Sequence, residues 1–411
     1  MHYVIIGNGG AGISALQAIR EVDKTSDVTI ISREQYPAYS PCSLPNLIAE
    51  EVDKPTIFRF DKQFYHRLNA RFMKNTEALE IDPKNKEVIF ANGDCVKFDK
   101  LLVAAGAKPI TPRGIKGLEL DGVHVMGTLD SALGILDHIN QGTSRVVVVG
   151  GGFMGIETAT MLKKREIEVS IVEMLPRILS RMLDPDISDK VTEILKYHDI
   201  KLVLNDTVES INGKKTVTGV SLGKNKLRCD MVVLAIGVTA NVDIVKGSGI
   251  EVNKGVIVDP KMQTNKKNIY AAGDIVEVRE QIEGKRGSFA IWPNAIEQGR
   301  IAGLNMTGRP IKYEGAEVVN VLDVFDIPVV AMGRTSLEIG KCKMITRFTP
   351  HASKKILLKN NRILGLQFVG TIRNAGTFYS LMKKGLDISS VEERLLDDNL
   401  VITPDVIPPQ I

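Results

Sequence analysis

The feature that most constrains this chain is a pair of glycine-rich fingerprints, each lying between a β-branched run and a segment with helical character. The first is Gly7-Asn8-Gly9-Gly10-Ala11-Gly12, and the second is Gly150-Gly151-Gly152-Phe153-Met154-Gly155. In such a strand-to-helix turn, the glycines permit a tight bend, let backbone N–H groups approach a pyrophosphate, and let helix and strand pack closely. Two turns of this kind predict two dinucleotide-binding sites in one polypeptide.

The segments around both fingerprints repeat a β-α-β pattern. A helix over 11–22 and a strand over 28–31 follow the first fingerprint, and a helix to about residue 164 and a strand over 169–172 follow the second. The fingerprints lie 143 residues apart (150 minus 7), which indicates a duplicated domain and not a solenoid repeat. The prediction is an α/β fold with two Rossmann-like domains and a small C-terminal α+β domain.

Composition excludes several classes of function. The net charge is +4, from 53 basic and 49 acidic side chains, which argues against nucleic-acid binding. The basic stretch 354–359 is interpreted as a half-solvated strand and not as a binding patch. No apolar run approaches the ~18 residues of a membrane span. The first strand begins almost at the N-terminus and leaves no room for a signal peptide. The four cysteines lie far apart in the sequence, so we expect a protein of the reduced, cytoplasmic compartment.

Cysteine and histidine spacing gives no metal site. The four cysteines form no C-x-x-C pair, and none of the six histidines has metal-ligand spacing or a nearby cysteine. We therefore predict no bound metal.

An acidic side chain at the end of the second strand of such a unit accepts hydrogen bonds from ribose hydroxyls. In the second copy this residue is Glu173, which lies 23 positions after Gly150. A carboxylate there repels a 2′-phosphate and favours NADH, although Arg177 and Arg181 leave NADPH possible. The alternative is a surface glutamate that caps the strand. In the first copy the strand ends at Ser32, so Glu34 is the candidate.

Several motifs in order resemble those of the FAD-dependent pyridine nucleotide–disulfide oxidoreductases. The first fingerprint resembles the FAD adenylate site, and the second resembles the NAD site. The other matching segments are Leu102 to Gly106 with Pro109, Thr264 with Ile269 to Asp274, and Trp292, Ala295, Gln298 and Gly299. The resemblance covers about residues 1 to 310 closely and the remainder loosely.

This resemblance implies cofactors, domains and binding residues. The cofactors are FAD and NADH. The implied domains are an FAD-binding domain in two parts (1–112 and 240–315), an NAD(H)-binding domain (113–239) and a C-terminal dimerisation domain (316–411). The implied cofactor-binding residues are Gly7, Gly9, Gly12, Glu34, Ala105, Gly106, Gly150, Gly152, Gly155, Glu173, Gly237, Gly273 and Asp274.

Three residues are candidates for the chemistry. In the family, an aromatic at the position of Phe153 covers the flavin until nicotinamide displaces it, and Glu157 points toward the contact between flavin and nicotinamide. A buried phenylalanine and a solvated helix glutamate are the structural alternatives. Cys42, in the turn after the second strand, resembles the cysteine of the single-cysteine branch, which contains the coenzyme A-disulfide reductases, NADH oxidases and NADH peroxidases. Its structural alternative is a small buried thiol.

The sequence departs from that branch at some positions, and the acceptor stays open. There is no histidine in the first fingerprint, Asn46 replaces the lysine of the ferredoxin-reductase branch, and the stretch 400–405 has no aromatic. The first hypothesis is an enzyme that passes electrons from NADH through FAD and Cys42 to a small disulfide, a polysulfide, oxygen or peroxide. The second is an FAD/NAD subunit that exchanges electrons with iron–sulfur partners, as in phenylglyoxylate dehydrogenase-like assemblies. A non-catalytic flavin protein is a third. A homodimer is expected in either catalytic case.

Overall fold

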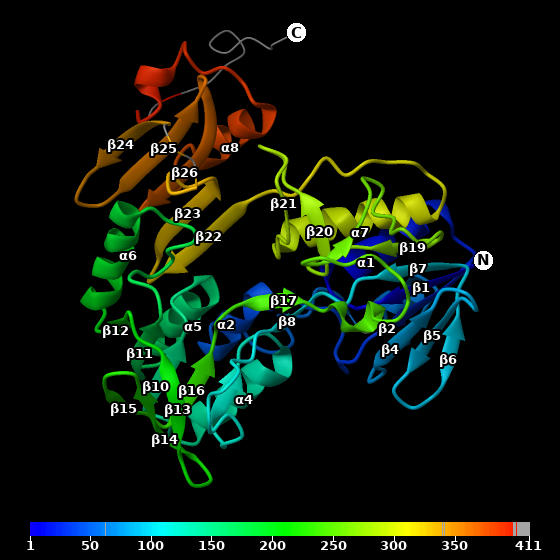
Figure 1. Ribbon diagram of the computed structural model, residues 1–411, viewed down its shortest axis with the longest axis horizontal. Coiled ribbons are helices and arrows are strands. Elements are labelled where there is room, and N and C mark those ends of the chain that lie inside the picture. The colour runs from blue at the N-terminus through cyan, green and yellow to red at the C-terminus, as the bar shows by residue number, and fades with distance from the viewer. Residues whose placement is uncertain (62, 339, 341, 398–399, 401–411) are drawn as a thin grey trace. The chain divides into compact units, whose positions relative to one another are not determined.

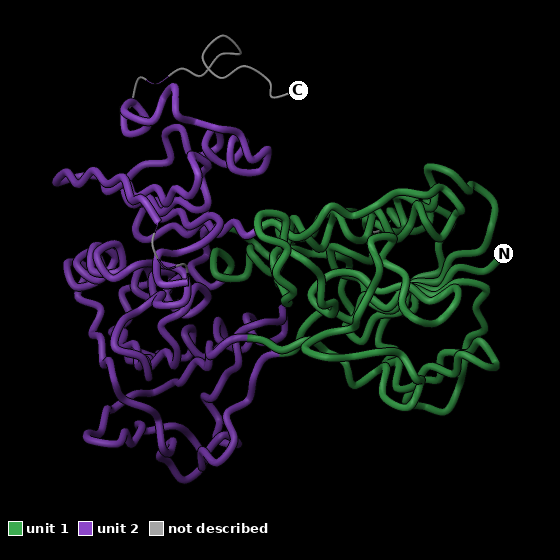
Figure 2. The backbone as a smooth tube through the Cα atoms, turned by 45° about the horizontal axis from the view of Figure 1, so that its top comes forward, with its two compact units in different colours: residues 1–47, 52–108, 238–317 green, residues 48–51, 109–237, 318–411 purple. Residues whose placement is uncertain are grey.

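The computed structural model describes residues 1–61, 63–338, 340, 342–397 and 400, and its chain divides into two compact units (Figure 2). Unit 1 contains residues 1–47, 52–108 and 238–317, and unit 2 contains residues 48–51, 109–237 and 318–411. The C-terminal sheet thus groups with the segment that holds the second fingerprint. A separate C-terminal domain over 316–411 stays a prediction. Within the described ranges, no helix is long and apolar enough to cross a membrane.

The core of unit 1 is a five-stranded parallel sheet in the order β19-β7-β1-β2-β3 (Figure 1). All of its strands except the edge strand β3, which is only partly buried, are mostly apolar and buried, as parallel strands covered on both faces must be. The strands are β1 (His2–Ile6), β2 (Asp27–Ile31), β3 (Ala70–Met73), β7 (Lys100–Val103) and β19 (Ile269–Ala271). Helices α1 (Gly10–Val22) and α7 (Trp292–Met306) pack together, because Gly299 lets α7 approach the backbone of Ala11.

Unit 2 contains a second parallel sheet, in the order β12-β11-β10-β16-β9. Its strands are β9 (Val123–Val125), β10 (Arg145–Val149), β11 (Glu168–Glu173), β12 (Lys201–Leu204) and β16 (Met231–Leu234). Helices α4 (Leu129–Asn140), α5 (Phe153–Lys164) and α6 (Pro185–Tyr197) belong to this unit. In both sheets the strand before the glycine fingerprint is central and has equivalent neighbours. This confirms the predicted α/β class with duplicated Rossmann-like sheets.

The outer strands show how each sheet is completed. In the first sheet the edge strand beside β7 is β19, whose residues lie late in the chain. In the second sheet the edge strand beside β16 is β9, whose residues precede the second fingerprint. The smaller elements of unit 1 are β4 (Ala78–Asp82), β5 (Glu87–Phe90), β6 (Cys95–Lys97), α3 (Phe64–Arg67), η2 (Val242–Val245), β18 (Val256–Ile257), β20 (Val276–Arg279) and β21 (Arg286–Gly287). Strand β8 (Ala107–Pro109) pairs with β17 (Val238–Ala240).

The C-terminal part of unit 2 is an antiparallel sheet in the order β22-β23-β26-β25-β24. A three-stranded antiparallel sheet, β13-β14-β15, completes the unit. The bounds are β13 (Val208–Gly213), β14 (Val217–Leu222), β15 (Lys226–Arg228), β22 (Val319–Val324), β23 (Ile327–Gly333), β24 (Lys343–Phe348), β25 (Ser353–Lys359), β26 (Arg362–Val369), α8 (Ala375–Lys384) and η3 (Glu392–Arg394).

One sequence interpretation is wrong in this sheet. The stretch 354–359, expected to be half-solvated, forms most of β25, and Lys354 and Lys355 are only 3% and 6% exposed. Lys355 is buried because its Nζ pairs with Asp184 Oδ2 (2.7 Å) and Asp186 Oδ1 (2.9 Å) at the start of α6. A buried cation requires such partners. These partners lie about 170 residues earlier in the chain, so strand alternation alone could not reveal them.

Candidate functional site

The carboxyl edge of the first sheet gathers residues that are distant in sequence. Strands β1, β2, β7 and β19 end in register, with Ile6 opposite Ile31 and Val103, and Val103 opposite Ala271. The predicted residues therefore emerge side by side: Gly7 after β1, Glu34 after β2, Ala105 and Gly106 after β7, and Gly273 and Asp274 after β19. In open parallel sheets, ligands bind outside the carboxyl ends of the strands.

Two kinds of glycine occur in each fingerprint. A Cβ at Gly7 would lie 2.1 Å from the Ala104 carbonyl oxygen, and one at Gly12 would lie 1.9 Å from that of Gly7. Gly150 and Gly155 repeat this crowding against their own neighbours, at 2.5 and 1.9 Å. These four glycines are needed by the protein's own packing.

Gly9 and Gly152 are different. Apart from the adjoining backbone, no atom of the described residues lies within 4 Å of a Cβ at either position, and both have ordinary extended backbone as N-caps of α1 and α5. Neither residue carries a side-chain cap on its helix. The protein itself therefore does not require glycine there. An anion seated against the helix N-terminus does, so both loops fit a pyrophosphate.

Asp274 fits a partner rich in hydroxyl groups. Burial raises the pKa of its carboxyl to about 6, and no hydrogen-bond donor to this carboxylate occurs among the described residues. The preceding Gly273 has a φ of +85° and donates its N–H to Gln298 Oε1 on α7 (2.8 Å). Gln298 Nε2 in turn donates to Tyr313 Oη (3.1 Å). The turn is thus fixed, while its carboxylate keeps capacity for hydroxyl donors.

The structure also shows residues near the first fingerprint that the sequence reasoning did not single out. Tyr65 Oη donates to Asn8 Oδ1 (2.7 Å), and Asn8 Nδ2 donates to the Tyr36 carbonyl (3.2 Å). These bonds fix the glycine loop against the turn that follows β2. In that turn, Tyr39 Oη donates to Glu34 Oε2 (2.8 Å). Asn8 occupies a variable position of the fingerprint, so its sequence context gave no signal.

Cys42 lies in the 3-10 turn η1 (Pro41–Ser43), immediately before the short helix α2 (Leu44–Ile48). The thiol is exposed, which excludes the alternative of a small buried core cysteine. Cys229 has that environment instead: it is 1% exposed, and burial raises its pKa to about 12.

The stretch 401–405, interpreted above for its lack of an aromatic, lies outside the described residues.

In unit 2, Glu173 ends β11 beside the second fingerprint. Its carboxylate accepts the Gly151 N–H (2.6 Å) and the Leu175 N–H (2.8 Å). Glu173 therefore belongs to the glycine loop itself and is not a solvated strand cap. Gly237, with a φ of +105°, comes shortly after β16, which is the neighbour of β10 on the side opposite β11. Gly150, Glu173 and Gly237 therefore meet at the carboxyl edge of this sheet.

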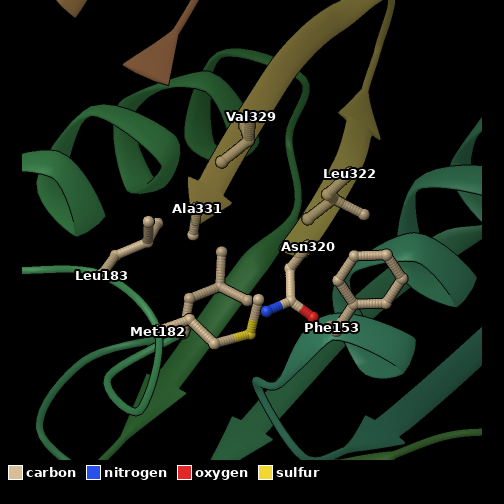
Figure 3. A pocket seen from close by; sticks show the side chains of 8 residues that line it. Phe153, Met182, Leu183, Asn320, Leu322, Val329 and Ala331 are labelled. Carbon is tan, nitrogen blue, oxygen red and sulfur yellow. The ribbon is translucent and has the colours of Figure 1, made fainter. Parts of the chain in front are cut away.

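Phe153 is the first residue of α5, and its ring borders a small apolar pocket (Figure 3). Figure 3 shows this ring opposite Met182 and Leu183, with Asn320 between them. The other lining residues are Leu179, Leu322, Val329 and Ala331. The only polar member is Asn320.

Glu157 lies one helical turn after Phe153. Its Oε2 atom is buried and has no hydrogen-bond partner in the part of the chain that the structure describes. Burial, and secondarily the Asp323 carboxylate of β22, raise the pKa of Glu157 to about 7. Glu157 is therefore not the solvated helix glutamate of the structural alternative. A buried carboxyl without a partner fits a group that receives one from a ligand.

The raised pKa of Glu157 makes a stability prediction. Between pH 4.5 and 7 the folded state holds a proton that the unfolded state has lost, so stability falls as pH rises through this window. Glu157→Gln should remove that decline. At pH 8 the variant should be more stable than the wild type by up to ~3 kcal/mol, and the two should be alike at pH 4. Urea unfolding at both pH values measures this.

The control for this measurement is Glu193→Gln on the exposed face of α6, which should leave the pH slope unchanged. An equal pH slope in the wild type and in Glu157→Gln would contradict the burial argument.

No group of three or more histidine, cysteine, aspartate or glutamate side chains in the described part of the chain could hold a metal ion. The side chains of His124 and His138 are in contact, with ring nitrogens 3.1 Å apart. Burial lowers the pKa of His124 to about 4.

Comparison with known proteins places this geometry among flavin- and nicotinamide-dependent enzymes. Residues 1–299 match the family "Pyridine nucleotide-disulphide oxidoreductase". An NADH oxidase of Methanocaldococcus jannaschii is 33% identical over 91% of this chain and 89% of its own length. Subunit epsilon of the NADH-dependent phenylglyoxylate dehydrogenase of Aromatoleum evansii is 29% identical over 98% and 97%. A solved NAD-dependent persulfide reductase from A. fulgidus has a TM-score of 0.90 at 27% identity, covering 98% of this chain and 80% of its own.

Proposed function

Because the chain belongs to the pyridine nucleotide-disulphide oxidoreductase family, an assignment that makes it an FAD- and NADH-dependent oxidoreductase, we propose that it passes electrons from NADH to a sulfur acceptor through Cys42. The net reaction is NADH + H⁺ + RSSR → NAD⁺ + 2 RSH. The observation that carries the proposal is the exposed thiol of Cys42 in unit 1, the unit that also holds the glycine loop with open space at Gly9. The second loop of this kind, at Gly152, belongs to unit 2.

The residues divide the work of binding. The N–H groups of the loop from Gly7 to Gly12 hold the pyrophosphate of FAD, and Asp274 accepts hydrogen bonds from its ribityl hydroxyls. The loop from Gly150 to Gly155 holds the pyrophosphate of NADH. The bound flavin supplies the ability to take a hydride from nicotinamide and return two electrons.

Cys42 performs the acceptor chemistry. Its thiolate attacks one sulfur of the acceptor disulfide, which forms a mixed disulfide and releases the first thiolate. Two electrons that entered from NADH then cleave the mixed disulfide, which releases the second thiolate and restores the Cys42 thiolate. The match to a persulfide reductase supports a sulfur acceptor, and the exposed thiol supports direct attack.

The roles of Phe153 and Glu157 belong to the same proposal. The Phe153 ring, which borders an apolar pocket of unit 2, occupies the nicotinamide position until NADH binds. The unpartnered Glu157 carboxyl is the protein group that contacts the nicotinamide end of NADH.

A second candidate function is an electron-transfer subunit in a larger complex. It is favoured by the similarity to subunit epsilon of phenylglyoxylate dehydrogenase, which extends over nearly the full length of both chains. Steady-state oxidation of NADH with separate acceptors distinguishes the two functions. Coenzyme A disulfide and polysulfide should support turnover if the sulfur proposal holds. Turnover with only a reducible iron–sulfur protein would favour the second function and overturn the first.

The proposal includes a cytoplasmic homodimer. Strand β24, at the edge of the C-terminal sheet, exposes Met344 and Phe348 (49% and 46%), and apolar surface of this kind favours an interface. Sedimentation velocity should give twice the chain mass.

Glu173→Ala tests the nicotinamide nucleotide site. Loss of its charge-assisted hydrogen bonds, roughly 1.5–3 kcal/mol, should raise the KM for NADH by about ten- to a hundredfold. Glu173→Gln keeps an acceptor for the Gly151 N–H but removes the charge, so it should narrow the preference for NADH over NADPH. Initial rates with each nucleotide measure both effects. An unchanged KM in Glu173→Ala would place the nucleotide elsewhere.

A further inference from the structure

We propose that the C-terminal sheet of unit 2 holds the glycine loop of the NADH site in its binding conformation, and that Asp184 is the positioning residue through which it does so. The inference rests on the proposed role of the loop from Gly150 to Gly155. It adds a residue that acts on this loop through the turn between β11 and α6, and not by contact with the nucleotide.

The turn between β11 and α6 contacts the glycine loop at Gly151. The Leu179 N–H donates to the Gly151 carbonyl (2.7 Å), and a Cβ at Gly151 would lie 3.0 Å from Ile178 Cγ2. Both Ile178 and Leu179 are buried. The turn therefore holds the loop at the residue whose own N–H donates to Glu173.

The same turn is bonded to the start of α6. The Leu183 N–H donates to the Leu179 carbonyl (2.9 Å), and Ser188 Oγ, in the first turns of α6, donates to the Ile178 carbonyl (2.8 Å). The Ser188 N–H donates to the Asp184 carbonyl (2.9 Å). Leu179 has a φ of +50°, a left-handed conformation that a leucine keeps only where its surroundings hold it. The position of the turn thus follows the position of α6.

Asp184 bonds the start of α6 to the C-terminal sheet. It is the N-cap residue of α6, yet its carboxylate caps no N–H of this helix, all of which the structure describes. Its Oδ1 accepts the Ser336 N–H (3.0 Å), and its Oδ2 accepts from Ser336 Oγ (2.6 Å) and Lys355 Nζ (2.7 Å). Its backbone N–H donates to Gln367 Oε1 (2.7 Å). Ser336 lies shortly after β23, Lys355 on β25 and Gln367 on β26, so one residue meets three parts of the sheet.

These bonds are buried and charged. The side chains of Asp184 and Lys355 are only 1% and 8% exposed. Burial alone would raise the pKa of Asp184, but the bonds from Lys355 and Ser336 outweigh it and lower that pKa below its usual value. Charge-assisted bonds of this kind are short and directional. A buried ion pair contributes little net stability, but it can select one arrangement of the elements that carry it.

The apolar side of the turn contacts the same sheet. Leu179, Met182 and Leu183 line the pocket beside Phe153, and the rest of its wall comes from strands β22 and β23 (Figure 3). A continuous path of contacts therefore runs from the C-terminal sheet through Asp184 and the turn to Gly151. We call this path the Asp184 tie.

A double variant, Asp184→Ala with Lys355→Met, tests the Asp184 tie in the full-length, FAD-loaded enzyme. It removes both members of the ion pair, so neither is left as a buried charge without its partner. The KM for NADH, and the Kd for NAD⁺ measured by calorimetry, should each rise roughly tenfold, the scale of substitutions along a coupled network. Flavin reduction at saturating NADH should change by less than about twofold, because bound nucleotide restores the loop.

Two controls separate positioning from general loss of stability. Phe378→Leu opens a cavity under the buried face of α8, so it should lower the melting temperature and leave the KM for NADH unchanged. Lys190→Met with Glu193→Ala makes a similar change at an exposed pair on α6 and should alter neither property. Asp184→Asn with Lys355→Met keeps an acceptor for Ser336 and should recover part of the lost affinity. An equal rise of KM in Phe378→Leu would overturn the positioning role.

Hydrogen–deuterium exchange reads the Asp184 tie without turnover. The Leu179 N–H bonds to the Gly151 carbonyl, so the peptide 174–184 should exchange faster in the double variant, while the peptide of strand β10 stays protected. Unchanged exchange of 174–184 would overturn the tie, and faster exchange with an unchanged Kd for NAD⁺ would overturn its role in nucleotide binding. Failure of the proposed function is distinguishable, because Gly152→Val would then keep normal reduction by NADH.

Discussion

Replacement of Cys42 by serine is expected to reduce turnover with polysulfide or a small disulfide to the rate seen without enzyme, while NADH still reduces the bound flavin. A serine hydroxyl is not ionised near neutral pH and cannot form the mixed disulfide. The exposed position of Cys42 before α2 makes a folding defect from this small change unexpected. Stopped-flow reduction and steady-state turnover, measured on the same preparation, separate the two half-reactions.

Cys95→Ser is the matched control, because Cys95 is equally an exposed cysteine of unit 1 but lies on β6. It should retain wild-type turnover. Full activity of Cys42→Ser with every acceptor would show that the thiol takes no part in catalysis.

The second large effect is expected from a crossed pair of glycine variants. Gly9→Val should fold and yet purify without the yellow colour of flavin, because its side chain enters open space that the pyrophosphate needs. Gly152→Val should keep the flavin and lose reduction by NADH. Circular dichroism, flavin absorbance and the rate of reduction by NADH measure the three properties.

Gly12→Val provides the contrast for this pair. Its Cβ would lie 1.9 Å from the Gly7 carbonyl oxygen, so the variant should fail to fold and not merely lose a ligand. Retention of flavin by Gly9→Val would contradict the assignment of the first loop to FAD.

Local patterns in the sequence predicted most of the fold. The β-branched runs before each fingerprint became the central strands β1 and β10, because such runs form buried parallel strands. The glycine turns then specified where each helix begins. The sites follow from this, since residues at the carboxyl ends of parallel strands meet whatever their distance in sequence. Glu173 was found for that reason, whereas Asp274 was found through the resemblance to the family's motif.

What the sequence could not predict depends on contacts between distant segments. The buried pairing of Lys355 with Asp184 reverses the interpretation of β25, and nothing near either residue signals it. The raised pKa of Glu157 depends on its burial in unit 2 and on the charge of Asp323 in the C-terminal sheet. Neither periodicity nor motif spacing contains this information.

An anaerobic titration with NADH tests the central claim most directly. The FAD-loaded wild type and Cys42→Ser are first exposed to coenzyme A disulfide, freed of the excess, and then titrated while the flavin absorbance is followed. The wild type should take up more electrons than the two that FAD accepts, and Cys42→Ser should stop at two. If both proteins stop at two, Cys42 is not a redox centre, and the chain is a flavin relay to a partner protein.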